Sequence, residues 1–178
     1  MPPTLTAAPV VKKVRRKSPW FLGGIVVLLL IIGVVNYCTN SARPNTTPDQ
    51  TLTAVLAGLL GDSNRNISRI LRATVDNDGT VEVHWSINNN LTLGLIRDSA
   101  RQDVVNIVAV VKQSLGVPKK LIIVGDFAVP DGYGHTVERP VIAAIYSAQT
   151  LANIKPDGIR SDQILGVADS AEIDPAFQ

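Results

Sequence analysis

One uncharged apolar run near the N-terminus constrains this chain more than any other feature. It extends from Trp20 to Tyr37 and reads WFLGGIVVLLLIIGVVNY. A helix that spans a bilayer needs about 20 predominantly apolar residues. Because lipid offers the backbone no hydrogen-bond partner, an isolated spanning run has to be helical. We therefore expect a transmembrane helix over residues 19–38, with the rings of Trp20 and Tyr37 at its two interfaces.

The residues before this run predict its direction. They include five basic side chains and no acidic one: Lys12, Lys13, Arg15, Arg16 and Lys17. All fifteen acidic residues of the chain follow the run. Segments rich in Lys and Arg stay in the cytoplasm and attract anionic lipid. We expect residues 1–18 to form a basic cytoplasmic tail and the C-terminal domain to be extracytoplasmic, so that the chain is a single-pass protein of the cell membrane.

A cleaved signal peptide is the alternative interpretation of the same run. Cleavage near Ala42 would release a secreted domain, but the run is longer than the apolar core of about 7–15 residues typical of a signal. Cys38, the only cysteine, excludes a disulfide within the chain. It could pair two copies or carry an acyl group, but a free cysteine at a lipid boundary more often fills space as a small, soft side chain, and we expect that role.

The residues beyond the run divide into three parts. Residues 39–47 (TNSARPNTT) are typical of a short linker, residues 48–155 have the size of one domain, and residues 156–178 are expected to be a weakly structured tail. This part of the chain is mildly acidic, and the basic cluster lies beside the apolar run. We therefore expect no nucleic-acid partner.

Periodicity predicts the elements of the domain. A helix is expected from Pro48 to Leu60, because Thr47 and Gln50 form a capping box and Gly61 follows. Strands are expected over 67–76 and 80–88, a long helix over 95–115, strands over 120–129 and 137–147, and a short helical segment over 148–155. Pro140 suggests an edge or a bulge. The order α-β-β-α-β-β predicts an α+β fold: an antiparallel sheet with helices on one face.

One corner of the predicted sheet gathers polar side chains. Asp126, Asp131, Tyr133, His135 and Glu138 lie around the turn between the last two strands. Two carboxylates and an imidazole could bind a cation or act as acid and base. Asp and Gly are favoured in tight turns, so the turn by itself explains Asp131 and its neighbouring glycines. No second histidine or cysteine joins the group to complete a set of metal ligands. We take these five residues as a candidate binding corner and expect no metal, no cofactor and no catalytic residue.

No catalytic signature occurs in the chain; the G-x-S-x-G, S-x-x-K, H-E-x-x-H and P-loop patterns are all absent. The region from Trp85 to Ile154 resembles uncharacterised membrane-anchored or secreted domains of Gram-positive and related bacteria, a resemblance that implies no activity. The leading hypothesis is a membrane-anchored binding or accessory domain of the bacterial cell envelope, with the lipid bilayer and other envelope proteins as partners. The alternatives are an envelope hydrolase that uses the Asp, His and Glu side chains of the corner, and a secreted domain.

Overall fold

A computed structural model describes residues 47–178. The predicted cytoplasmic tail, the membrane span with its flanking residues, Cys38 and residues 39–46 of the linker lie outside the described residues. Within residues 47–178, every helix is too short or too polar to cross a membrane. The described chain forms helices, strands and one 3-10 turn in the order α2 (Pro48–Leu60), β1 (Ser63–Asn64), β2 (Ile67–Ser68), β3 (Ile70–Val75), β4 (Thr80–Ser86), α3 (Leu93–Leu115), β5 (Lys120–Pro130), β6 (Thr136–Ser147), α4 (Ala148–Asn153), β7 (Ser170–Ile173) and η1 (Pro175–Phe177).

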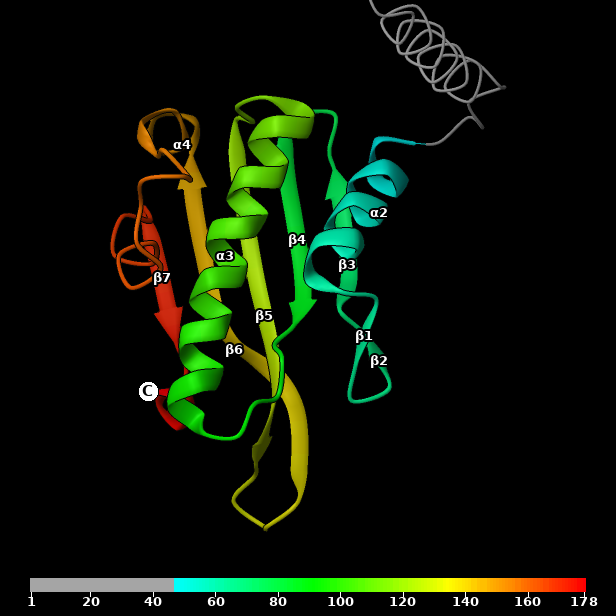
Figure 1. Ribbon diagram of the computed structural model, residues 1–178, viewed down its shortest axis with the longest axis vertical. Coiled ribbons are helices and arrows are strands. Elements are labelled where there is room, and N and C mark those ends of the chain that lie inside the picture. Colours follow the sequence, from blue (N-terminus) through cyan, green and yellow to red (C-terminus); the bar gives the residue numbers. More distant parts are fainter. Residues whose placement is uncertain (1–46) are drawn as a thin grey trace, which may run out of the picture. The chain divides into compact units, whose positions relative to one another are not determined.

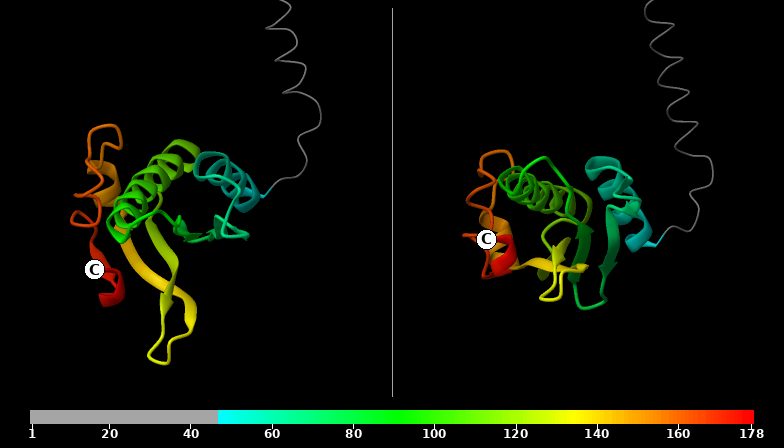
Figure 2. Two further views of the ribbon diagram at one scale, coloured as in Figure 1. Left: turned by 60° about the horizontal axis from the view of Figure 1, so that its bottom comes forward. Right: turned by 90° about the horizontal axis from the view of Figure 1, so that it is seen from below.

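The mixed α+β class is confirmed, but the sheet is not wholly antiparallel. Its five strands follow the order β3-β4-β5-β6-β7, and α2 and α3 lie on one face of it (Figures 1 and 2). Strands β3–β4, β5–β6 and β6–β7 pair antiparallel, whereas β4 and β5 are parallel neighbours. The 23-residue helix α3 connects these two strands. A connection of this length returns the chain to the same end of the sheet, so the next strand can run parallel.

The first helix begins and ends where the sequence predicts. Thr47 accepts a hydrogen bond from the Gln50 backbone N–H, and the Gln50 side chain returns to the Thr47 backbone, so the capping box is confirmed. Gly61, with a positive φ of 94°, ends the helix. Leu52 and Leu56 are its buried residues.

The core lies between the sheet and its two helices. Val81, Val83 and Trp85 of β4 alternate with partly exposed residues and are almost fully buried. The Trp85 ring lies against β5 at Gly125. A Cβ atom at Gly125 would lie only 2.6–2.9 Å from three atoms of that ring. Position 125 therefore requires a glycine for a packing reason.

A buried ion pair joins the helices to the sheet. The guanidinium of Arg69 lies 2.7 Å from the Asp103 carboxylate on α3. Arg69 also donates to the carbonyl oxygens of Leu60 and Ser86, at 3.2 and 2.6 Å. One side chain thus connects the last residue of α2, the end of β4 and the middle of α3.

Residues 156–178 are structured, in contrast to the weakly structured tail expected from the sequence. Strand β7 pairs with β6 from Ile142 to Ile145. Ile164 and Phe177 are buried in the core, and the Tyr146 hydroxyl donates to the Ile164 carbonyl oxygen at 3.0 Å. Because this segment supplies a strand and core side chains, it is an integral part of the domain.

Candidate functional site

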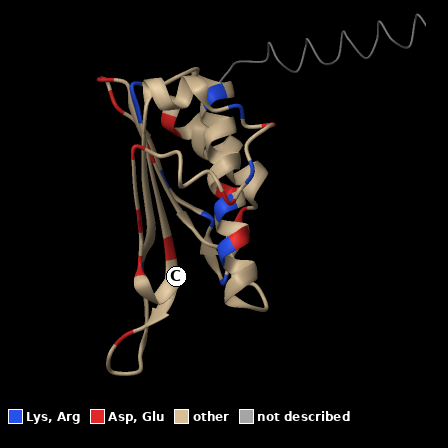
Figure 3. Ribbon diagram, turned by 90° about the vertical axis from the view of Figure 1, so that its left-hand side faces the viewer, with Lys and Arg blue, Asp and Glu red and all other residues tan. Residues whose placement is uncertain are grey.

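Strands β5 and β6 continue beyond the rest of the sheet as a two-stranded arm. The β4–β5 ladder ends at Ser86 and Asp126, and the β6–β7 ladder ends at Ile142. Beyond those points β5 and β6 pair only with each other, as far as Pro130 and Thr136. We call residues 127–139 the arm. It projects below the sheet in Figure 1, and Figure 3 shows the same projection from the side.

Hydrogen bonds within the turn fix the conformation of the arm tip. One carboxylate oxygen of Asp131 accepts from the backbone N–H groups of Tyr133 and His135, both at 2.8 Å. The other oxygen lies 3.1 Å from His135 Nδ1. Although burial alone would raise the pKa of Asp131, these hydrogen bonds outweigh it and hold the pKa below its ordinary value. Gly134, at a φ of 86°, supplies the left-handed residue of the turn.

The tip presents one large aromatic side chain to solvent. Tyr133 is 90% exposed and Val137, behind it on β6, is 42% exposed. A tyrosine offers a large contact area with few rotatable bonds and a hydroxyl that can donate or accept. On a fixed turn, such a side chain has the properties of a binding anchor.

Arg65 braces the base of the arm. It lies in the turn between β1 and β2, where both Arg65 and Asn66 have positive φ. Its guanidinium donates to the two carboxylate oxygens of Glu138 at 2.7 and 2.9 Å and to Ser86 Oγ at 3.0 Å. The guanidinium carbon also lies 5.1 Å from the centre of the Phe127 ring. A bidentate pair of this kind fixes orientation as well as distance.

Asp126 lies near the Arg65–Glu138 pair. Unlike Glu138, it has a carboxylate oxygen without a hydrogen-bond partner among the described residues. This oxygen, Oδ1, is buried. Burial raises the pKa of Asp126; the charge of His84 opposes that rise, and the charge of Glu138 adds to it. This carboxyl group therefore binds a proton more readily than an ordinary aspartate.

The structure divides the five predicted corner residues into two groups. Asp126 and Glu138 lie at the base of the arm, where Glu138 is opposite Ala128 in the ladder. Asp131, Tyr133 and His135 lie at the tip. Asp131 lies five positions after Asp126, at the end of the extended chain of β5, which corresponds to about 16 Å. A proton cannot pass directly between groups so far apart, so the five residues do not form one acid–base centre.

Arg65 is the residue of this candidate site that the sequence did not predict. The run Asp62-Ser63-Asn64-Arg65-Asn66 is typical of a turn. Nothing in the sequence indicates that an arginine in this turn pairs with a glutamate 73 positions away. The partner could be identified only from the fold.

Prolines at the two ends of the arm ladder disfavour the addition of another strand. Pro130 ends β5 and Pro140 lies in β6 opposite Asp126, where the register of the ladder shifts. This shift confirms the irregularity that Pro140 predicted. Prolines and irregular registers on exposed edges prevent pairing with other chains. Contacts made by the arm therefore depend on its side chains.

The described chain has no obvious place for a metal. Among residues 47–178, no group of three or more His, Cys, Asp or Glu side chains is placed to hold a metal ion. Comparison with known proteins gives no further guide, since no protein family, curated protein or solved structure matches this chain.

Proposed function

We propose that this chain is a single-pass membrane protein of the bacterial cell envelope whose extracytoplasmic domain binds a partner protein through the arm. The apolar run from Trp20 to Tyr37 and its basic flank support the anchor and its orientation. The domain acts as an accessory component: it holds or positions another envelope protein close to the membrane and performs no chemistry of its own.

The observation that carries the binding role is the braced arm with Tyr133 at its tip. The Glu138 carboxylate, held by two hydrogen bonds from Arg65, fixes the base, and the Asp131 carboxylate fixes the turn. A preorganised surface loses little conformational entropy on binding. An exposed aromatic side chain on such a surface is the kind of residue that contributes most to protein interfaces.

The hydrolase alternative receives less support. It requires the carboxylates and the imidazole of the corner to act together, but Asp126 on β5 and Asp131 just after its end are about 16 Å apart. Both carboxylate oxygens of Glu138 are already bound by Arg65. The secreted-domain alternative concerns the N-terminal run, and the mass of the mature protein tests it directly.

Site-specific photocrosslinking in the native membrane tests the proposal. Tyr133 is replaced by a benzophenone-bearing amino acid in the full-length chain, and the cells are irradiated without disruption. We expect one discrete adduct to a second envelope protein. Val117, which is 48% exposed at the other end of the domain, receives the same probe as the matched control. Equal adducts at both positions, or none at Tyr133, would contradict the proposal.

A substitution then measures the contribution of the side chain. Tyr133→Ser removes a side chain that is 90% exposed, so the packing within the domain should change little. We expect the affinity for the crosslinked partner to fall by about 2 kcal/mol, or roughly 30-fold, as for an interface hot spot. The unfolding temperature should not change. An unchanged affinity would assign the binding to another surface.

A further inference from the structure

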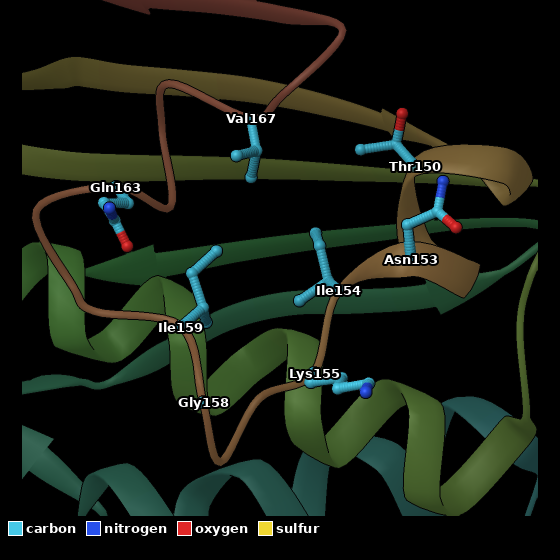
Figure 4. A pocket seen from close by; sticks show the side chains of 8 residues that line it. All are labelled: Thr150, Asn153, Ile154, Lys155, Gly158, Ile159, Gln163 and Val167. Atoms are coloured by element: carbon cyan, nitrogen blue, oxygen red, sulfur yellow. The ribbon is translucent and has the colours of Figure 1, made fainter.

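A second candidate site lies away from the arm, between α4 and the loop that follows it. Here the surface forms a wide, solvent-open pocket of about 530 Å³ (Figure 4). Its volume lies within the range typical of small-molecule sites. The walls come from Thr150 and Asn153 of α4 and from residues 154–167 of the loop.

Contacts outside the pocket hold its walls in place. Lys112 of α3 donates to the carbonyl oxygens of Leu151 and Ile154, at 2.6 and 2.5 Å, and so holds the C-terminal end of α4. The Asp169 carboxylate accepts from the Ser147 backbone N–H at 2.5 Å and from the Thr150 hydroxyl at 2.9 Å. Each end of the short helix is therefore fixed, and the pocket is formed before any ligand arrives.

The loop wall is also supported by its own backbone. The N–H groups of Gly158 and Ile159 donate to the Lys155 carbonyl oxygen at 2.9 and 3.0 Å. Those of Gly166 and Val167 donate to the Gln163 carbonyl oxygen at 3.0 and 3.2 Å. These two turns place Ile159 and Val167 on opposite sides of the hollow (Figure 4).

The lining is apolar in its middle and polar at its margin. The side chains of Ile154, Ile159 and Val167 surround the hollow, and Thr150, Asn153, Lys155 and Gln163 lie around them (Figure 4). Lys155 is the only charged side chain of the lining. Within residues 47–178 it forms no salt bridge. The lining therefore combines an apolar surface with two amides and one cation that has no salt-bridge partner within residues 47–178. The Asp169 carboxylate, which is not part of the lining, accepts hydrogen bonds from Ser147 and Thr150.

We propose that the α4 pocket binds a small amphipathic anion: an apolar body packs against Ile154, Ile159 and Val167, and its anionic group lies beside Lys155. Burial of the body supplies most of the affinity, and the cation at the margin selects the sign of the ligand charge. This site is independent of the partner protein proposed for the arm. An organic carboxylate and an organic phosphate share the required chemistry.

Three probes of one shape but different charge test the proposal. Indole-3-acetate, indole-3-acetamide and tryptamine are added to the full-length protein in lipid nanodiscs, with methyl groups of Ile and Val labelled for NMR. We expect the methyl signals of Ile154, Ile159 and Val167 to shift. Indole-3-acetate should bind about two- to fivefold more tightly than the neutral amide, the range of an exposed charge pair, and tryptamine should bind most weakly. No shift at these three residues, or equal affinities for the three probes, would overturn the proposal.

Variants of two lining residues and one control identify the source of the preference. Lys155→Gln should give the acetate and the amide equal affinities, whereas Arg72→Gln, which removes the same charge from β3 at the opposite edge of the sheet, should leave the preference unchanged. The double variant Lys155→Gln/Val167→Glu leaves a single anion in the lining, at an exposed position, and should reverse the order of acetate and tryptamine. If the preference persists in Lys155→Gln, or the order is not reversed in the double variant, the assignment to this pocket is wrong.

Discussion

At the scale of single residues, Gly125 gives the simplest prediction. The Trp85 ring occupies the space that a side chain at position 125 would need. We expect Gly125→Ala to lower the free energy of unfolding by about 1–3 kcal/mol, because the ring or the strand has to move. Chemical denaturation measures this value. Gly132→Ala is the matched control, since a Cβ there has no neighbour within 4 Å, and equal stability of the two variants would contradict the packing described.

Asp103 predicts a pH dependence of stability. Burial raises the pKa of Asp103 above its ordinary value of 3.8, and the Arg69 guanidinium opposes only part of that rise. A carboxyl group whose pKa is higher in the folded chain binds its proton more tightly there. Its contribution to stability is therefore greatest below about pH 4 and is lost as the pH rises through the folded-state pKa.

Comparison with Asp103→Asn isolates this titration, because asparagine does not ionise. We expect the stability of the wild type minus that of the variant to decrease between about pH 3 and pH 7. Denaturation at a series of pH values measures the difference. An increase over the same range would mean that attraction to Arg69 outweighs the cost of burying the charge.

At the scale of elements, the arm depends on its brace. Arg65→Gln removes the bidentate pair with Glu138. Hydrogen bonds to charged groups contribute about 1.5–3 kcal/mol, so we expect the amides of residues 127–139 to exchange with solvent at least about tenfold faster. The amides of β3 and β4 should keep their rates.

Hydrogen exchange resolved by residue checks this effect, with Arg160→Gln as the control. Arg160 pairs with Asp162, two residues away on an exposed loop, and its loss should leave the arm unchanged. If exchange rises uniformly over the whole domain in Arg65→Gln, the arginine stabilises the fold and does not specifically brace the arm.

The C-terminal segment gives a second prediction at this scale. Phe177 is buried, and its ring centre lies 5.6 Å from that of Phe127. Phe177→Ala should destabilise the domain by about 3–5 kcal/mol, whereas Leu91→Ala, at a side chain that is 97% exposed, should have little effect. Thermal unfolding distinguishes the two. A small effect of Phe177→Ala would instead support the prediction from the sequence that residues 156–178 form a weakly structured tail.

The elements also show which parts of the fold the sequence could predict. Alternation and turn residues correctly predicted the hairpins β3–β4 and β5–β6, and capping residues predicted α2. The parallel β4–β5 pair was missed although a strand, a long helix and a strand follow one another there, a pattern that favours parallel neighbours. Strand β7 has four residues, Ser170–Ile173, and three of them are exposed. A segment so short and polar gives no periodic signal.

At the scale of the whole molecule, the chain combines a predicted membrane anchor with a domain that carries two separate candidate surfaces. The arm supports binding of a protein, and the α4 pocket supports binding of a small anion. The sequence located the residues of the arm but assigned them to one corner, because it could not show how far β5 and β6 extend beyond the sheet. It gave no indication of the α4 pocket, whose walls lie largely in a segment without periodicity.

Cysteine labelling in intact cells is the most direct test of an extracytoplasmic domain whose arm binds a partner protein. It shows at once on which side of the membrane the domain lies and whether a bound protein shields Tyr133. Cys38, the only native cysteine, is replaced by serine, and Val117→Cys and Tyr133→Cys are introduced separately. The cells and the purified proteins are treated with the same membrane-impermeant maleimide. We expect the Val117→Cys variant to react equally fast in both settings and the Tyr133→Cys variant to react several-fold more slowly in cells. Labelling of Val117→Cys only after permeabilisation, or equal labelling of Tyr133→Cys in both settings, would contradict the proposal.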